Sequence, residues 1–416
     1  MGNRSINAQD SIPDRQDAAL SSKKRVRDTG RTGRARIALA HDWLVTVRGG
    51  EAVLERLAGY VNEHHEAAAL LTLFDAGMSI GPQTDKIPRV AAGKSRLPMA
   101  KALRRWMAPL YPSMVEELSG RLESLDETAA IDLLISTSSG LIKNLKAPGH
   151  ASHLCYCHTP ARWLYSQLGE YGAGSGGGGL RGLGLKLFGN KLRAFDRSGT
   201  RFVSRFVANS EHTRLLVETI YQREATVVPP PVKTRFFRPD PAVQREDFWL
   251  LVSALEPYKR VDLAIEAAAR ARQRLIVAGE GTQKGFLTAH ARAMSKKHAG
   301  GVKGLVEFVG RVTDDQLLGL YRRAGVFIFP QVEDFGITAV EAQACGCPVV
   351  ARAEGGALDT VIEGQTGAFF EDADADALIA AARTVTANPA ACRTSAKRFS
   401  ETIFDQRMAM QIEAAL

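Results

Sequence analysis

Short apolar runs alternate with helix-spaced apolar positions along the second half of the chain. Six runs rich in β-forming residues predict strands buried on both faces, at Trp249–Ala254, Arg274–Ala278, Val306–Val309, Val326–Phe329, Val349–Ala351 and Ala368–Phe370. The stretches between them carry helix signals, such as the capping box at Thr313–Gln316. Strands separated by helices predict a parallel sheet with helices on both of its faces.

The first half shows the same alternation with longer interruptions. Strands are expected at residues 36–40, 132–136, 153–157 and 202–208, and Asn209-Ser210 is expected to cap the helix that follows. Gly49-Gly50 predicts a glycine turn between the first strand and a helix, which is the start of a Rossmann-like unit. The glycines are explained either by a tight structural turn or by a close approach to a ligand. Residues 172–184 are glycine-rich and predict a flexible loop or lid.

A proline-rich stretch divides the two halves. Five prolines lie between Pro229 and Pro241, where neither a helix nor a central strand can form. With 416 residues and 45% hydrophobic content, the chain can form two medium-sized domains. We therefore predict an α/β protein with a tail at 1–35, a Rossmann-like domain at 36–226, a linker at 227–245, a second Rossmann-like domain at 246–390 and terminal helices at 391–416.

The net charge of +9 is concentrated in the predicted tail. Residues 1–36 hold nine Lys or Arg and four Asp, which gives +5 and leaves +4 for the other 380 residues. The tail is polar and aperiodic, so we expect it to be disordered, and the folded part is too weakly basic to predict nucleic-acid binding. The five cysteines show no zinc-finger spacing and are expected to be reduced thiols, and no apolar run reaches the roughly 18–20 residues of a membrane span. The N-terminus lacks a secretory signal, so a cytoplasmic protein is predicted.

One basic segment in the first half predicts contact with a membrane surface. Residues 86–115 hold seven Lys or Arg and no acidic residue. After Pro98, the side chains of Met99, Leu103, Trp106 and Met107 follow the spacing of a helix face. A basic amphipathic helix with a tryptophan is typical of helices that lie on anionic lipid. The alternative is an ordinary surface helix packed on the sheet.

Two carboxylates lie within the strand–loop–helix–strand unit at 326–350. Glu333 is in the loop, and Glu341 is in the helix that Gly336 opens, at an inward position that would normally be apolar. A buried carboxylate must be paired or hydrogen-bonded, so Glu341 is explained either by a structural ion pair or by a ligand. The N–H groups at Gly336-Ile337 and the helix dipole offer an anion site, and an anion site flanked by carboxylates suits a phosphorylated sugar.

This unit resembles the signature of family 4 of the retaining glycosyltransferases (group 1 glycosyltransferases), which have the GT-B fold. The resemblance rests on Glu333 and Glu341, which are separated by seven residues that include Phe335-Gly336. It implies that Glu333 holds hydroxyls of the donor sugar and that Glu341 holds the ribose of the nucleotide. It also implies that Gly336 and Ile337 cap a diphosphate oxygen, with Phe335 beside them.

The first turn of the second domain, 253–260, is similar to the family's phosphate-binding turn. Lys259 matches the family's lysine, whereas Ser253 or Ala254 stands where the family has an arginine. Arg260 either supplies the missing charge or is a solvated residue at a helix start. Gly279–Gly281 resembles the family's next glycine turn, and the loop that contains Arg311 and Val312 resembles the one that lies against the nucleotide base. Gly355-Gly356 precede another helix and are expected to offer further N–H groups to phosphate.

The resemblance extends to the first domain and covers the chain from about Ile37 onward. Gly49 and Gly50 match the Gly-Gly that lets a loop approach donor and acceptor in this family. The sequence from Tyr156 to Arg162, Tyr-x-His-Thr-Pro-x-Arg, is similar to bacterial family 4 enzymes of exopolysaccharide and O-antigen synthesis. By this resemblance His158 lies beside the transferred sugar, although a histidine at a strand end is also common as a structural residue.

The resemblance implies a retaining, metal-independent hexosyltransferase without a cofactor, in which Lys259 and helix N-termini stabilise the departing diphosphate. Overall likeness favours GDP-mannose as the donor. A lipid-linked oligosaccharide or polysaccharide acceptor at the inner face of the cell membrane would fit the basic segment. The alternatives are a UDP-sugar donor, a GT-B nucleotide-sugar epimerase and a non-catalytic basic scaffold.

Overall fold

The computed structural model describes residues 33–46, 49–97, 99–165, 178–386 and 388–416. Ala35–Leu416 form one compact unit. The predicted tail lies almost wholly outside the described residues.

The first half of this unit is built on a seven-stranded, all-parallel sheet in the order β3-β2-β1-β4-β5-β6-β7. The strands are β1 (Arg36–Leu44), β2 (Glu66–Asp75), β3 (Arg89–Ala91), β4 (Leu133–Ser138), β5 (Ser152–Cys157), β6 (Arg205–Ala208) and β7 (Ala225–Val227). The apolar runs predicted at 36–40, 132–136 and 153–157 are confirmed as strands. The strand predicted at 202–208 begins only at Arg205, because residues 200–202 form a 3-10 turn.

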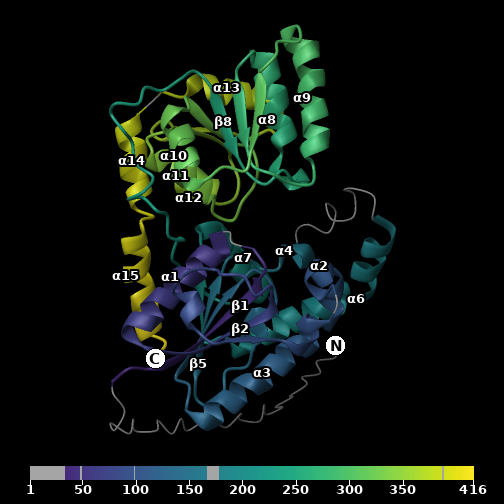
Figure 1. Ribbon diagram of the computed structural model, residues 1–416, viewed down its shortest axis with the longest axis vertical. Helices are drawn as coiled ribbons and strands as arrows, with labels where there is room; N and C mark the ends of the chain where they lie inside the picture. The colour runs from purple at the N-terminus through teal and green to yellow at the C-terminus, as the bar shows by residue number, and fades with distance from the viewer. Residues whose placement is uncertain (1–32, 47–48, 98, 166–177, 387) are drawn as a thin grey trace, which may run out of the picture. The chain divides into compact units, whose positions relative to one another are not determined.

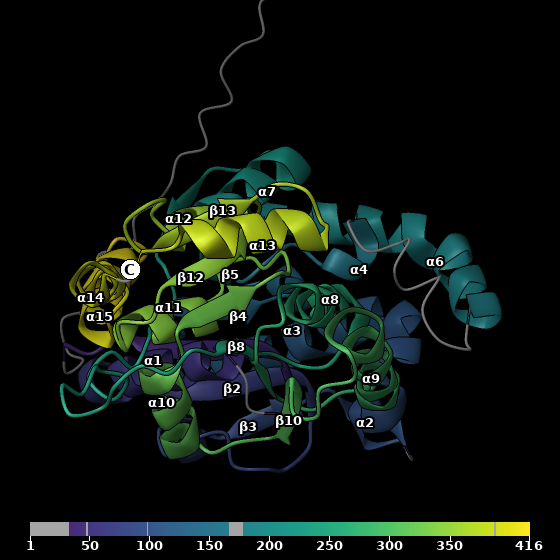
Figure 2. The ribbon, with the colours of Figure 1, turned by 90° about the horizontal axis from the view of Figure 1, so that it is seen from above.

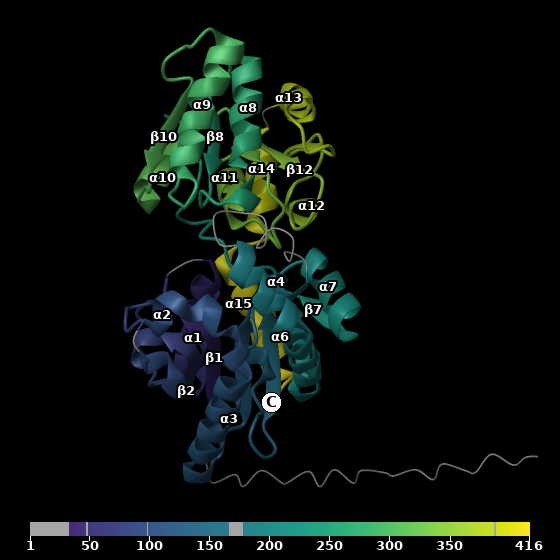
Figure 3. The same ribbon diagram turned by 90° about the vertical axis from the view of Figure 1, so that its right-hand side faces the viewer.

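Helices cover both faces of this sheet (Figure 3). The core on one face includes side chains of α3 (Tyr111–Thr128) and α6 (Gly178–Gly199). The core on the other face includes α1 (Gly49–His64) and α15 (Glu401–Glu413). Beyond β6 lies α7 (Glu211–Tyr221), and the Ser210 hydroxyl accepts the Thr213 N–H as the predicted cap.

The second half is built on a six-stranded, all-parallel sheet in the order β10-β9-β8-β11-β12-β13. The strands are β8 (Trp249–Val252), β9 (Leu275–Ala278), β10 (Val306–Gly310), β11 (Val326–Phe329), β12 (Val349–Arg352) and β13 (Gly367–Phe370). All six predicted strands are therefore present, with bounds shifted by two residues at most. The capping box at Thr313 and Gln316 is also formed.

Two helical layers enclose this second sheet. The core on one face is shared with α8 (Val261–Ala271), α9 (Lys284–Ala299) and α13 (Ala375–Thr384). The core on the other face is shared with α10 (Asp314–Arg323), α11 (Ile337–Ala344) and α14 (Pro389–Lys397). Figure 2 shows α8 and α9 across β8 from α10 and α11.

The chain passes twice between the two halves, and the two passages are hydrogen-bonded to each other. Val232, in the predicted linker, donates its N–H to the Phe399 carbonyl at 2.9 Å and forms a bridge with Ser400. After Ser400, α15 lies beside α1 (Figure 1), where Arg56 Nε donates to Asp405 Oδ1 at 2.7 Å. The C-terminal helix thus completes the first half of the fold.

Three local predictions are wrong. Gly49 and Gly50 do not form a turn before a helix, because they are themselves the first residues of α1. The glycine-rich loop is helical from Gly178 onward, and its earlier residues lie outside the described part. The basic segment is no continuous amphipathic helix, because α2 spans only Ala100–Leu103 and Arg104–Leu110 form a 3-10 helix that contains Pro109.

Within the described ranges, none of the helices is both long enough and apolar enough to cross a bilayer.

Candidate active site

The loops that follow β8 and β11 meet at the carboxyl edge of the second sheet, where open parallel sheets bind ligands. Lys259 closes a one-turn 3-10 helix after β8, and Glu333 lies in the loop between β11 and α11. Lys259 Nζ donates a hydrogen bond to Glu333 Oε1, and the two side chains are only 13% and 22% exposed. Two residues that the sequence assigned to diphosphate and sugar therefore form an ion pair.

Gly336 places the start of α11 beside this pair. Its φ of +92° is a left-handed conformation, and a Cβ atom at this position would lie 2.8 Å from Phe329 Cζ. Glycine is therefore required here for two separate reasons. No side chain caps the helix N-terminus that begins at Ile337, so its first N–H groups and the helix dipole suit an anion.

Phe335 has a different role from the one predicted. Its side chain is 3% exposed and packs edge-on against Phe399, with ring centroids 5.3 Å apart. The ring therefore belongs to the core of the second half, and only the Phe335 backbone remains for contact with a donor.

Glu341 is held by a hydroxyl group and not by a cation. Tyr321 Oη donates to Glu341 Oε2 at 3.1 Å, and Glu341 forms no ion pair with any described residue. Burial raises the pKa of Glu341 to about 7, although the Tyr321 hydrogen bond acts in the opposite direction. The structural ion pair considered for Glu341 is therefore absent from the described structure, and the carboxylate keeps acceptor capacity for further hydroxyl groups.

The first half contributes a group of side chains at the carboxyl ends of its strands. His158 follows β5, and its Nε2 is buried without a hydrogen-bond partner among the described residues. Burial, together with a smaller effect of the neighbouring His41, lowers the pKa of His158 to about 3. A Cβ atom on Gly50 would lie 3.5 Å from His158 Nε2 and 3.6 Å from His41 Cε1. His158 is therefore a neutral imidazole beside the Gly-Gly pair.

His41 and Glu51 were not identified as site residues from the sequence. His41 Nδ1 lies 2.7 Å from the Thr137 hydroxyl, and His41 Nε2 lies 3.8 Å from Glu51 Oε1. His41 is in the carboxyl-terminal part of β1, just as His158 follows β5. The signal that singled out His158, a polar residue at the carboxyl end of a predicted strand, could have found His41 as well.

Two close approaches join these groups to the second half. A Cβ atom on Gly49 would lie 2.8 Å from Ile337 Cδ1, so the glycine permits close approach of the α1 and α11 N-termini. Arg162 Nη2 lies 2.6 Å from Asp334 Oδ2, which joins the loop after His158 to the loop that carries Glu333. For Gly49 this geometry shows a close approach to α11, and the predicted approach to a ligand stays a prediction.

Arg260 does not occupy the place of the missing arginine. It adopts a left-handed φ of +49°, its side chain is 38% exposed, and its Nε lies 3.5 Å from Asp262 Oδ1. Arg311 is exposed after β10, and Val312 packs at the margin of the core that contains Phe329. In the described part of the chain, none of these three side chains forms a hydrogen bond or ion pair with Lys259, Glu333 or Glu341.

The two further glycine turns contact the backbone of the loops that carry Lys259 and Glu333. A Cβ atom on Gly279 would lie 1.8 Å from the Ser253 carbonyl oxygen, so this turn packs against the lysine-bearing loop. The Gly356 N–H donates to the Glu333 carbonyl at 2.8 Å and is not available for phosphate. The Gly355–Gly356 turn therefore positions Glu333. Among the described residues, no three His, Cys, Asp or Glu side chains are grouped closely enough to hold a metal ion.

Comparisons with known proteins agree with this architecture. Residues 232–404 match the model of the family "Glycosyl transferases group 1". The D-inositol 3-phosphate glycosyltransferase of Geodermatophilus obscurus is 35% identical over 232 residues, which cover 51% of this chain and 52% of the relative. The GDP-mannose-dependent alpha-(1-6)-phosphatidylinositol monomannoside mannosyltransferase of Mycolicibacterium smegmatis is 33% identical over 205 residues, 43% of this chain and 52% of the relative. The chain thus spans about half the length of these curated relatives.

The fold also matches a solved structure over most of its length. The crystal structure of Anabaena Alr3699/HepE in complex with UDP has a TM-score of 0.69, with 16% identity, and covers 91% of this chain and all of that one. The GT-B fold, with two parallel-sheet Rossmann-like domains, is therefore confirmed. Within it, residues 232–404, which include Lys259, Glu333 and Glu341, are those that match the group 1 glycosyl transferases.

Proposed function

We propose that the protein is a retaining hexosyltransferase of family 4 that uses a nucleotide-diphospho-sugar, with GDP-mannose as the preferred donor. The observation that carries the proposal is the Lys259–Glu333 pair beside the uncapped N-terminus of α11, with Ile337 in contact range of Gly49. A cation, a helix N-terminus and a carboxylate together suit a diphosphate joined to a sugar.

In this proposal each group acts on a different part of the donor. Lys259 and the α11 N–H groups stabilise the charge that develops on the departing diphosphate, which preorganised donors do without a metal ion. Glu333 accepts hydrogen bonds from sugar hydroxyls, and Glu341 accepts them from the ribose.

His158 contacts the sugar or the acceptor hydroxyl through its unpartnered Nε2. Its lowered pKa makes it a neutral hydrogen-bonding group and excludes a role as a charged acid near pH 7. The acceptor hydroxyl attacks the anomeric carbon from the face that the diphosphate leaves, and the configuration is retained without a covalent enzyme intermediate.

Two comparisons bear on the nucleotide and favour different bases. The Mycolicibacterium smegmatis relative is named GDP-mannose-dependent, whereas the Anabaena structure contains UDP. We prefer GDP because the first of these is 33% identical in the matched part, whereas the Anabaena structure is only 16% identical. A UDP-sugar donor is the second candidate, and the UDP complex is the observation in its favour.

The proposed acceptor is a lipid-linked oligosaccharide or a polysaccharide at the inner face of the cell membrane. The basic segment at 86–115 supports this proposal, because its large apolar side chains face solvent. Five of them are at least 40% exposed, namely Leu97, Met99, Leu103, Trp106 and Leu110. Packing on the sheet, the alternative for this segment, accounts for Met107, Ala108 and Tyr111, which belong to or lie against the core, but not for the five exposed side chains.

Thermal stabilisation by free GDP, UDP and ADP, without added metal, tests the donor site. A nucleotide at 100 times its dissociation constant should add about 2.7 kcal/mol to the free energy of unfolding. Selective stabilisation by GDP supports the proposal. Selective stabilisation by UDP would indicate a UDP-sugar as the donor in place of GDP-mannose. No stabilisation by any nucleotide would contradict the proposal and favour a non-catalytic scaffold. Release of free sugar without an acceptor would favour an epimerase.

A further inference from the structure

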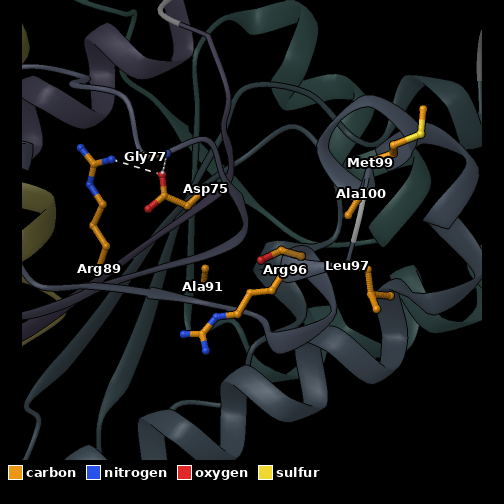
Figure 4. A pocket seen from close by; sticks show the side chains of 9 residues that line it. Asp75, Gly77, Arg89, Ala91, Arg96, Leu97, Met99 and Ala100 are labelled. Carbon is orange, nitrogen blue, oxygen red and sulfur yellow. Dashed lines mark hydrogen bonds and ion pairs between the residues drawn. The ribbon is translucent and has the colours of Figure 1, made fainter.

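A pocket of about 530 Å³ lies in the first half, away from the residues assigned to the donor. It is bounded by the end of β2, by β3 and by the segment that leads into α2, as Figure 4 shows. Its lining includes Asp75, Arg89, Arg96, Leu97 and Met99. Asp75 pairs with Leu44 in the parallel register of β1 and β2, so the pocket opens at the same carboxyl edge of the sheet as His41.

The pocket contains one cation that no described carboxylate neutralises. Arg89 forms ion pairs with two carboxylates, because its guanidinium lies 3.2 Å from Asp75 Oδ1 and 2.5 Å from Asp85 Oδ1. Arg96 is exposed and forms no ion pair with a described residue. The other nearby acid, Glu117, accepts the Gly93 N–H at 2.8 Å. The positive charge of Arg96 is therefore available to an anion.

The opposite end of the pocket is apolar and exposed. In Figure 4 the Arg96 guanidinium lies on the side of Arg89 and Asp75, whereas Leu97 and Met99 lie on the other side. Leu97 is 55% exposed and Met99 is 70% exposed. Leu103 and Trp106, in the next two helical segments, are 42% and 46% exposed. A cation at one end and a group of exposed apolar side chains at the other complement an amphiphile with an anionic head.

We propose that this pocket binds the phosphate-bearing end of a lipid acceptor. Arg96 contacts the phosphate, and Leu97 and Met99 contact the first part of the apolar chain, which continues over Leu103 and Trp106 into the bilayer. This assignment rests on the proposed transferase function, because it gives the acceptor its place at the sheet edge shared with His41. The volume is within the range of small-molecule sites and holds a head group with its first attached sugar.

Binding of the full chain to lipid vesicles tests the role of Arg96. The probes are phosphatidylcholine vesicles with a minor fraction of a polyprenyl monophosphate, and matched vesicles in which phosphatidylglycerol supplies the same charge. Arg96→Gln should weaken binding to the polyprenyl phosphate vesicles about fivefold, as expected for loss of one basic contact at an anionic surface. The control is Arg121→Gln, an exposed arginine of α3 outside the pocket, which should bind as the unchanged protein does.

Three results would overturn the proposal. Equal losses for Arg96→Gln and Arg121→Gln on both vesicle types would indicate general attraction to a charged surface. Unchanged vesicle binding by Arg96→Gln would show that Arg96 does not contact the lipid phosphate. Stabilisation by inorganic phosphate alone that depends on Arg96 would assign the pocket to a free anion and not to a lipid.

Met99 provides a test of the apolar end that spares the fold. Its φ of +58° is left-handed, and asparagine tolerates this conformation better than methionine does. Met99→Asn should therefore keep the thermal stability of the protein and weaken binding to the polyprenyl phosphate vesicles. Quenching of Trp106 fluorescence by brominated lipid, measured as the difference from Trp106→Phe, should accompany binding. Absence of both effects would exclude an apolar contact.

The nucleotide experiment separates this inference from the proposed function. Arg96→Gln should retain the full nucleotide stabilisation of the unchanged protein, because Arg96 lies outside the donor residues. If no nucleotide stabilises either protein but Arg96-dependent binding to polyprenyl phosphate persists, the transferase proposal fails and the lipid-phosphate pocket stands. If nucleotides stabilise both proteins but vesicle binding does not depend on Arg96, only the pocket assignment fails.

Discussion

Lys259 and Glu333, which are far apart in sequence, form an ion pair between the loops after two neighbouring strands, β8 and β11. In the proposed function their ligands are different parts of one molecule. Lys259 would bind the diphosphate and Glu333 the sugar, so the donor must replace the contact that the two residues make with each other. Free GDP carries a diphosphate that can bind Lys259, but it has no sugar to bind Glu333.

Glu333→Gln should abolish sugar transfer without weakening the binding of free GDP. The substitution removes an acceptor for sugar hydroxyls and also releases Lys259 for the diphosphate, so GDP affinity should stay constant or rise several-fold. Calorimetric titration with GDP and a transfer assay would measure the two effects. A fall in GDP affinity by tenfold or more would mean that Glu333 is needed to organise the nucleotide site itself.

Lys259→Met should weaken GDP binding and slow transfer together. Loss of one preorganised charge at a developing anion typically costs about 10²–10³ in rate. Lys303→Met is a suitable control, because Lys303 is exposed just before β10 and lies outside the residues assigned to the donor. Nucleotide titrations and initial rates of transfer, measured on both variants, would test whether GDP binding and transfer fall only in Lys259→Met. Equal effects at the two positions would show that Lys259 acts through general charge and not at the diphosphate.

Glu341→Gln should change the pH dependence of stability. Because burial raises the pKa of Glu341 from 4.5 to about 7, the folded protein keeps a proton that the unfolded chain releases in this window. Stability from this group is therefore present below pH 4.5 and is lost as the pH rises to about 7. Above pH 7, glutamine should stabilise the ligand-free protein, by about 3 kcal/mol at most for a shift of this size.

Urea unfolding of the unchanged protein and of Glu341→Gln at pH 5 and pH 8 would test this sign. The variant should be more stable at pH 8 and nearly equal at pH 5. It should also bind GDP more weakly, because the ribose hydroxyls lose a carboxylate. A variant that is less stable at pH 8 would show that the ionised Glu341 is favourably held.

His158 should remain neutral across the working pH range of the protein. Burial lowers its pKa to about 3, so its ring resonances should not titrate between pH 8 and pH 5 in a magnetic resonance experiment. His158→Ala should lower the rate of transfer while GDP affinity remains within twofold, since in the proposed function the ring contacts the sugar and not the nucleotide. A titration of His158 near pH 6.5 would contradict both the burial and the proposed role.

The sequence was most informative where a residue's local neighbours determine its structure. Val326–Phe329 is a strand from end to end because four consecutive apolar residues suit burial on both faces. Gly336 was expected to open a helix, and α11 begins at the next residue. Two Rossmann-like halves could be predicted because such alternation of strands and helices recurs through both of them, whereas the GT-B fold was implied only by the family resemblance of the motif that contains Glu333 and Glu341.

Residues whose environment depends on distant partners could not be placed in the same way. Phe335 was assigned to the donor, but its ring packs on Phe399, which no local pattern indicates. The helix expected after Pro98 is broken at Arg104, where the chain continues as a 3-10 helix toward α3. The ion pair between Lys259 and Glu333 likewise required the register of two strands and not only the spacing of either motif.

The position of α15 has a consequence for the order of folding. Phe404, Met408 and Ile412 are buried in the core of the first half, although they follow the whole second half in sequence. A ribosome releases them only after the second sheet has been synthesised. The core of the first domain therefore stays incomplete, with part of its apolar surface exposed to solvent, until the second domain has been synthesised. A truncation before Phe404 would leave apolar surface of the earlier-made domain exposed, and exposed apolar surface of this kind promotes aggregation.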